Sequence, residues 1–143
     1  MNIIKEWKTK EGYKARVVSC EYQKGITHHY CGYIGITKKH PLFEKSYSQH
    51  CDALMKLRDK VLKEPIGKRG IIPIFCYDGE SASMHIIFNV HGGITFADYH
   101  DKNKSLWWIG FDCAHEDDTI EKCNVEYVIA ECNSLSKQIN VVE

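Results

Sequence analysis

The feature that most constrains the fold is a pair of strand-forming runs separated by a turn signal. Residues 15–22 and 28–36 are rich in β-branched and aromatic side chains, and Gln23-Lys24-Gly25 lies between them. Such side chains favour the half-buried surface of a strand, and a short glycine-containing connection favours a hairpin. We therefore expect an antiparallel hairpin here. Gly32 and Gly35 in its second strand indicate a bulge or the close approach of another group.

Further strands are expected in the second half of the chain. Residues 71–77 and 84–90 flank the turn signal Asp78-Gly79, which predicts a second hairpin. The short apolar run 106–111 is predicted to be a buried strand, and the charged segment 98–104 an exposed loop.

Two helices are expected to pack on these strands. Residues 49–63 carry apolar side chains on one helical face after Ser48, a favoured N-cap residue. Residues 119–139 carry a second apolar stripe, and Asp118 followed by Glu121 resembles a capping box at its start. Hairpin-linked strands with two amphipathic helices predict an α+β fold, a mainly antiparallel sheet with two helices packed on it.

Length and composition narrow the class of protein. The 143 residues suit one domain spanning residues 1–143. Nineteen basic residues balance nineteen acidic ones, so no overall charge favours extended nucleic acid or an anionic membrane. Neither a signal peptide nor a bilayer-spanning apolar run is evident, which predicts a cytoplasmic protein. The seven cysteines form no Cys-x-x-Cys pair, so reduced thiols are expected.

Two loops that follow apolar runs carry most of the chemically versatile side chains. In His91-Gly92-Gly93 the glycines permit backbone N–H groups to surround a phosphate or carboxylate, although an ordinary turn is the alternative. Asp112 and His115 follow the other run, and a carboxylate beside an imidazole can orient a catalytic histidine or supply metal ligands.

A metal site is a second interpretation of the same loops. His91, Asp112 and His115 would form an open site with two histidines and one carboxylate for a divalent metal ion, and the sequence identifies no cofactor beyond this candidate. The recognised zinc-ligand spacings are not present. Further donors in the sequence are Asp117, Asp118, Cys113 and His40. For Asp118 we prefer the role of helix N-cap, and for Cys113 that of a buried structural cysteine.

Aromatic residues near the two loops offer faces on which a nucleobase can stack. Trp107 and Trp108 alternate along one strand, so one of them is expected to face the core. Phe43 lies near His40 in a second aromatic group, and Thr95 offers a hydroxyl beside the glycine loop. Core packing is the alternative for each aromatic ring.

A resemblance to a known family rests on four segments, which are CGYIGITKKHPLF (31–43), VHGGITF (90–96), WWIGFDCAH (107–115) and residues 126–132. Over roughly residues 15–139 the chain resembles a family of small proteins encoded by bacteriophages and prophages, for which the resemblance supplies no activity. It implies a phage-type protein in the bacterial host cytoplasm. The polar positions that it marks are His40, His91, Thr95, Asp112 and His115. Members often carry Gly-Asp where this chain has Glu116-Asp117, so Asp117 gains no role from it.

The leading hypothesis is a phage-type protein that binds a small phosphorylated molecule, for example a nucleotide signal of bacterial defence. The residues expected to contact that ligand are His40, His91, Gly92, Gly93, Thr95, Trp108, Asp112 and His115. The alternative is a hydrolase, for example a metal-dependent phosphodiesterase, with His91, Asp112 and His115 as metal ligands or catalytic groups. A third hypothesis is an inhibitor of a host enzyme that acts through exposed Trp108 and Phe43. Whether the chain forms a homo-oligomer is left open.

Overall fold

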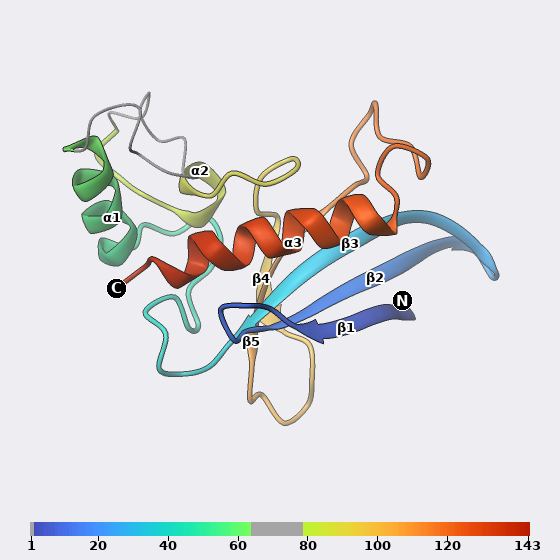
Figure 1. Cartoon of the computed structure of the whole chain (residues 1–143), viewed down its shortest axis with the longest axis horizontal. Helices are drawn as coiled ribbons and strands as arrows, with labels where there is room; N and C mark the ends of the chain where they lie inside the picture. The colour runs from blue at the N-terminus through green and yellow to red at the C-terminus, as the bar shows by residue number, and fades with distance from the viewer. Residues whose placement is uncertain (1, 64–78) are drawn as a thin grey trace.

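The chain forms one antiparallel sheet with helices packed against it (Figure 1), in a computed structural model that describes residues 2–63 and 79–143. The strand order is β1-β2-β3-β5-β4. The strands are β1 (Asn2–Lys8), β2 (Lys14–Gln23), β3 (Ile26–Ile36), β4 (Phe96–Tyr99) and β5 (Trp107–Asp112). The helices in the described ranges are α1 (Asp52–Leu62), α2 (Met84–Ile87) and α3 (Val125–Asn140). The predicted α+β class with a mainly antiparallel sheet is confirmed.

The expected N-terminal hairpin is formed by β2 and β3. Gln23 pairs with Ile26, and Gly25 between them has a φ of +85°. Gly32 marks a close approach of side chains, because a Cβ at this position would lie 2.6 Å from both the Cys132 Sγ and the Phe111 Cζ. The missing side chain therefore lets β5 and α3 pack tightly against β3.

Helix α3 covers one face of the sheet, lying across β2 and β3 in Figure 1. The predicted apolar stripe is confirmed, since Val128, Cys132, Leu135 and Ile139 are all completely buried. The helix starts later than predicted. Its N-cap is Asn124, whose side chain accepts a hydrogen bond from the backbone N–H of Tyr127, so the predicted cap at Asp118 is wrong.

The segment 84–90 was expected to be a strand and instead contains the short helix α2. Met84 and Ile87 are buried whereas Ile86 is exposed, a pattern that follows helical spacing and not strand alternation. The other half of the expected hairpin, residues 71–77, lies outside the described residues. Helix α1 is confirmed but begins after Cys51, not after Ser48.

The opposite face of the sheet carries a smaller buried cluster of Val18, Cys31, Tyr33 and Trp108. The Arg16 guanidinium lies 4.2 Å from the centroid of the Trp108 ring, and the half-buried His100 stacks on the same ring. The segment 98–104 is therefore less exposed than predicted, because its first residues belong to β4.

Two remaining findings concern membrane-spanning helices and the state of the cysteines. Within residues 2–63 and 79–143, no helix has both the length and the apolar character needed to cross a bilayer. The cysteines in these ranges carry free thiols, at positions 20, 31, 51, 113, 123 and 132.

Candidate functional site

His91 lies in the loop between α2 and β4, where two side chains of α3 hold it. Its backbone N–H donates to Glu131 Oε1 at 2.8 Å, and its Nδ1 lies 2.8 Å from the Tyr127 hydroxyl oxygen. Tyr127 and Glu131 are one helical turn apart and so project from the same face of α3. The helix thereby fixes both the backbone and the ring of this histidine.

Asp118 provides the carboxylate that faces His91. The His91 Nε2 lies 2.9 Å from each Asp118 oxygen, and the backbone N–H of His115 donates to the same carboxylate at 3.0 Å. Because a carboxylate only accepts, the His91 Nε2 carries a proton and donates it to Asp118. Burial raises the pKa of Asp118, but the hydrogen bonds from His91 and His115 outweigh it and hold this pKa below its usual value.

His115 packs directly on the glycine loop, so the two predicted loops do meet. A Cβ on Gly92, whose φ is +69°, would lie 2.0 Å from the His115 Nε2. The ring centroids of His91 and His115 are 5.7 Å apart. Only a glycine at position 92 combines this backbone conformation with space for the second imidazole.

Asp112 lies beside His115 as expected, but it is not the carboxylate that both histidines share. Thr95 Oγ1 donates to one Asp112 oxygen at 2.9 Å, and the Ala114 N–H donates to the other at 3.0 Å. The His115 Nε2 is 3.7 Å from that second oxygen, within ion-pair range. His91, His115 and Asp118 form one group whose ligand atoms all lie within 4.8 Å of one another, and Asp112 belongs to no such group among the described residues, so Asp118 and not Asp112 stands with the two histidines.

Two buried thiols line the inner side of His91. Cys123 Sγ lies 3.8 Å from the His91 Nε2 and 3.7 Å from an Asp118 oxygen. His91, Cys113 and Cys123 also offer three ligand atoms within 4.8 Å of one another. Burial raises the pKa of the Cys113 and Cys123 thiols, which keeps them protonated and weakly nucleophilic at neutral pH. Cys113 is thus a buried thiol, as expected, with a latent capacity to bind metal.

His40 does not reach this site. Its Nε2–H donates to the Ile139 carbonyl at 2.9 Å, and its Nδ1 accepts from the Leu42 N–H. Ile139 is about 12 Å further along α3 than Glu131, at 1.5 Å per helical residue. His40 therefore lies apart from the histidine site, and its imidazole connects the loop after β3 to the end of α3.

The glycine loop is a poorer phosphate nest than the sequence predicts. The Gly93 N–H donates to the Val90 carbonyl, and the His91 N–H is bound by the Glu131 carboxylate. These donors are therefore occupied, and the nearby carboxylates of Glu131 and Asp118 would repel a bare phosphate. The Gly93 N–H is thus engaged within its own turn and not directed at an anion.

Trp108 is also removed from the candidate site. It is 0% exposed and lies in the cluster on the face of the sheet opposite α3, so its ring offers no surface for a base to stack on. Phe43 is only half-buried, but the polar loops lie together and Trp108 is covered. The two conditions that would favour an inhibitor with an exposed aromatic patch are therefore not met.

Three residues of this site did not emerge from the sequence, namely Cys123, Tyr127 and Glu131, and Asp118 was named only as a further donor beside its preferred role as helix cap. Asp118 matched a capping pattern, and Cys123 and Tyr127 matched an apolar stripe. The one sequence signal that could have found Tyr127 and Glu131 is their spacing, because polar groups four residues apart share a helical face.

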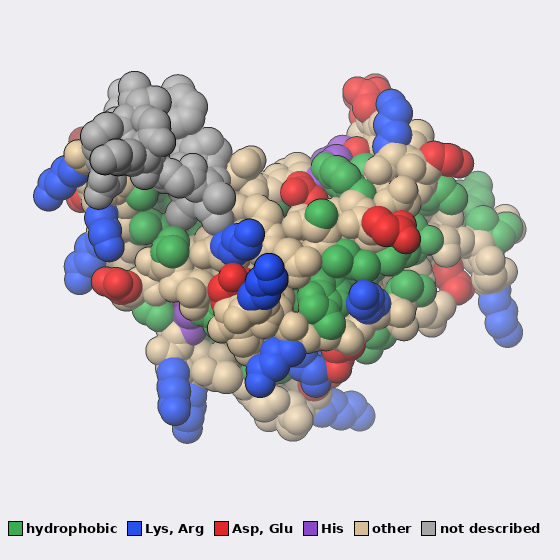
Figure 2. All heavy atoms as spheres, viewed as in Figure 1, with side chains coloured by type: hydrophobic (Ala, Val, Ile, Leu, Met, Phe, Trp, Pro, Cys, Tyr) green, Lys and Arg blue, Asp and Glu red, His purple; other side chains and the backbone are tan. Residues whose placement is uncertain are grey.

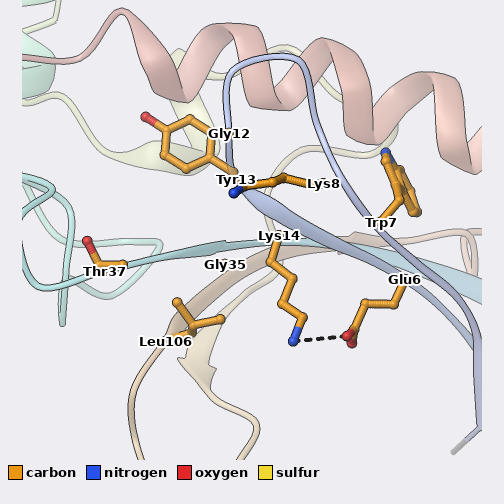
Figure 3. Close-up of a pocket in the computed structure, with 9 residues that line it drawn as sticks. All are labelled: Glu6, Trp7, Lys8, Gly12, Tyr13, Lys14, Gly35, Thr37 and Leu106. Carbon is orange, nitrogen blue, oxygen red and sulfur yellow. Dashed lines mark ion pairs between the residues drawn. The ribbon is translucent and has the colours of Figure 1, made fainter.

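A cavity of about 540 Å³ lies elsewhere, beside the β1–β2 turn (Figure 3). Its lining residues are Glu6, Trp7, Lys8, Gly12, Tyr13, Lys14, Gly35, Thr37 and Leu106. In Figure 3 the Tyr13 hydroxyl points toward α3, where it donates to Asn140, and Lys14 pairs with Glu6 at 3.0 Å. None of the lining residues comes from the loops that carry His91 and His115.

The histidine site opens to the surface on its outer side. The side chains of His115, His91 and Asp118 are 41%, 19% and 11% exposed. Figure 2 shows histidine beside acidic side chains at the base of the loop that projects after β5. Comparison with protein-family models, with curated proteins and with solved structures finds no match, so the functional argument rests on this geometry.

Proposed function

We propose that this chain is a metal-dependent hydrolase whose divalent ion is held by His91, His115 and Asp118. The observation that carries the proposal is the convergence of these three ligand atoms within 4.8 Å of one another. They come from the loop before β4 and the loop after β5, so only the folded chain assembles them. Three protein ligands with one exposed side leave a coordination position for water or substrate, as in catalytic zinc sites.

The charge around the histidines favours a cation over a phosphate as the first occupant. Asp118 contacts His91, Asp112 faces His115, and Glu131 binds the loop backbone. Three carboxylates around two imidazoles attract a divalent cation and repel an uncompensated phosphate. A phosphorylated substrate would therefore bind at this site by coordinating the divalent ion through its phosphate oxygens.

The remaining residues would position the ligands. His91 binds an ion through Nε2 only after releasing the proton that it now donates to Asp118. The proton can be carried instead on Nδ1, where the Tyr127 oxygen lies 2.8 Å away and can accept it. Asp112, fixed by Thr95 and the Ala114 N–H, orients His115.

A divalent ion at this position would supply hydroxide at neutral pH by lowering the pKa of bound water, and would polarise the bond to be cleaved. The proposed substrates are small phosphorylated molecules. The resemblance to phage proteins makes nucleotide signals of bacterial defence the first natural compounds to screen, and counter-defence the proposed role.

The test is hydrolysis of bis(4-nitrophenyl) phosphate by the purified chain loaded with Zn²⁺ or Mn²⁺. His115→Ala should lower kcat/KM at least about 100-fold, because it removes a direct ligand. His85→Ala, which changes an exposed histidine of α2, should retain activity. Equal activity of the two variants, or no metal-dependent turnover of phosphate esters, would contradict the proposal.

A second candidate function is binding of a phosphorylated small molecule in the cavity of Figure 3. It keeps the ligand class of the leading hypothesis from the sequence but moves the binding site from the two loops to this cavity. Its volume of about 540 Å³ suits a small ligand. Lys8 and Lys14 offer cations for phosphate, and Trp7 and Tyr13 offer aromatic faces for a ring.

Native mass spectrometry with added nucleotides separates this candidate from the hydrolase. A nucleotide adduct lost in Lys14→Ala and retained in His91→Ala would place the ligand in the cavity. Lys102→Ala, on the exposed loop after β4, is the control for loss of one positive charge. An adduct lost only in His91→Ala would instead assign the ligand to the histidine site.

A further inference from the structure

A second group of metal-ligating side chains lies on the β2–β3 hairpin. Cys20 of β2 pairs directly with His29 of β3, and Cys31 is two residues further along β3. Paired residues and residues two apart share one face of a sheet, so all three side chains project from the same side. Their ligand atoms lie within 4.8 Å of one another.

The separation of the two sulfurs matches the geometry of a bound zinc ion. Cys20 Sγ and Cys31 Sγ are 3.7 Å apart. Two thiolates on a tetrahedral zinc ion, each about 2.3 Å from the metal, are separated by about 3.8 Å. An ion could therefore enter between them without movement of the strands.

One ligand of the group is buried in the protein, and the other two are partly accessible to solvent. Cys31 is buried in the cluster that contains Trp108, whereas Cys20 and His29 are half-buried. The His28 and His29 Nδ1 atoms are 2.8 Å apart, a contact that fixes the His29 ring. The strand register shifts immediately after Cys20, and such irregularities commonly occur beside binding sites.

The ligand atoms favour a thiophilic ion, because two cysteine sulfurs and one imidazole nitrogen converge here and no carboxylate belongs to the group. An ion must displace thiol protons here, which Zn²⁺ does readily and the oxygen-preferring Mg²⁺ and Ca²⁺ do not.

We propose that Cys20, His29 and Cys31 bind one Zn²⁺ ion, with water at the fourth position. The site is separate from the proposed hydrolase centre and shares no ligand with it. The ion would join β2 to β3 near the turn of their hairpin.

Cobalt substitution tests the proposal in the full-length reduced chain. A thiolate-to-cobalt charge-transfer band should appear and should persist in the double variant His91→Ala/Cys123→Ser. It should be lost in Cys31→Ser and in Cys20→Ser, the latter being a half-exposed position that tolerates a polar side chain. Cys51→Ser, which changes a buried thiol near α1, is the matched control and should keep the band.

Metal content gives a second measurement of the same site. Zinc bound per chain should fall by one ion in Cys20→Ser and in His29→Gln, with the fold retained by circular dichroism. The proposal is overturned if zinc content and the cobalt band do not change in these variants. It is equally overturned if Cys51→Ser has the same effect.

Discussion

The His91 Nε2 lies 2.9 Å from both oxygens of Asp118, although the two residues are 27 positions apart in the chain. This contact connects the loop before β4 to the loop after β5. It also removes Asp118 from the role of helix cap that its sequence neighbours suggest. The proposed metal centre depends on it, because neither loop alone contains two histidines and a carboxylate.

Gly92→Ala should disrupt the site more than Gly93→Ala. Both glycines have positive φ, so each substitution should cost about 1–2 kcal/mol of stability. Only the Cβ at position 92 would strike the His115 Nε2, at 2.0 Å, whereas the nearest atom to a Cβ at position 93 is 3.5 Å away.

Zinc titration followed by calorimetry measures this difference. Zinc affinity at the histidine site should fall at least about tenfold in Gly92→Ala relative to Gly93→Ala. Equal affinities in the two variants would show that the position of His115 does not matter for the ion.

His100 should make the fold sensitive to mild acid. Burial and the nearby Arg16 guanidinium lower the pKa of His100 from its usual 6.5 to about 4. The unfolded chain therefore binds a proton more readily between these values, and stability falls as pH drops from 6.5 to 4.

Urea unfolding of His100→Phe between pH 7 and 4 tests whether His100 causes the loss of stability in mild acid. Phenylalanine keeps a ring against Trp108 and cannot be protonated, so the loss of stability on acidification should be smaller than in the unaltered chain. His29 and His40 also have lowered pKa values and should account for part of the remaining slope. If the free energy of unfolding depends on pH equally in the variant and the unaltered chain, His100 is not the source of that dependence.

The ionised carboxylate of Asp118 should stabilise the fold at pH values above its usual pKa of 3.8. Because its pKa in the folded chain lies below the usual 3.8, the contribution is present above pH 3.8 and is lost as pH falls through the lowered value. The difference in free energy of unfolding between the unaltered chain and Asp118→Asn should shrink across that interval. A difference that stays constant with pH would mean that Asp118 acts through its shape alone.

Gly32→Ala should be among the more damaging small substitutions. The added Cβ would lie 2.6 Å from both Cys132 and Phe111, where α3 and β5 close on β3, and should cost about 3 kcal/mol. Gly25→Ala is the control, since no atom lies within 4 Å of its Cβ and only backbone strain of about 1–2 kcal/mol is added. Chemical denaturation of both variants measures the difference.

Local patterns account for the parts of the fold that the sequence predicts correctly. The β2–β3 hairpin, the buried strand β5 and the apolar stripe of α3 each follow from side-chain spacing within one segment. The short apolar run 84–90 fits a strand or a helix equally, and the burial of Met84 and Ile87 resolves it in favour of a helix. Asp118 matches a capping pattern, but in the structure its carboxylate faces His91 and the helix is capped by Asn124 instead.

The sequence assigned His91 and His115 to one candidate site, and their rings do lie together, although the run before His91 contains α2 and is not the expected strand. Contacts between segments far apart in the sequence could not be predicted. Alternation indicated that one of two tryptophans is buried but not which face holds Trp108. His40 belongs to a segment that the family resemblance marks, yet it binds the end of α3 instead.

The most direct test of the metal centre compares two neighbouring aspartates. Asp118 contacts His91 and is 11% exposed, whereas the adjacent Asp117 is exposed. Zinc content of the purified, zinc-loaded chain is measured by elemental analysis for Asp118→Asn and Asp117→Asn. The account predicts one ion fewer per chain in Asp118→Asn and no change in Asp117→Asn. Equal zinc content in the two variants would contradict it.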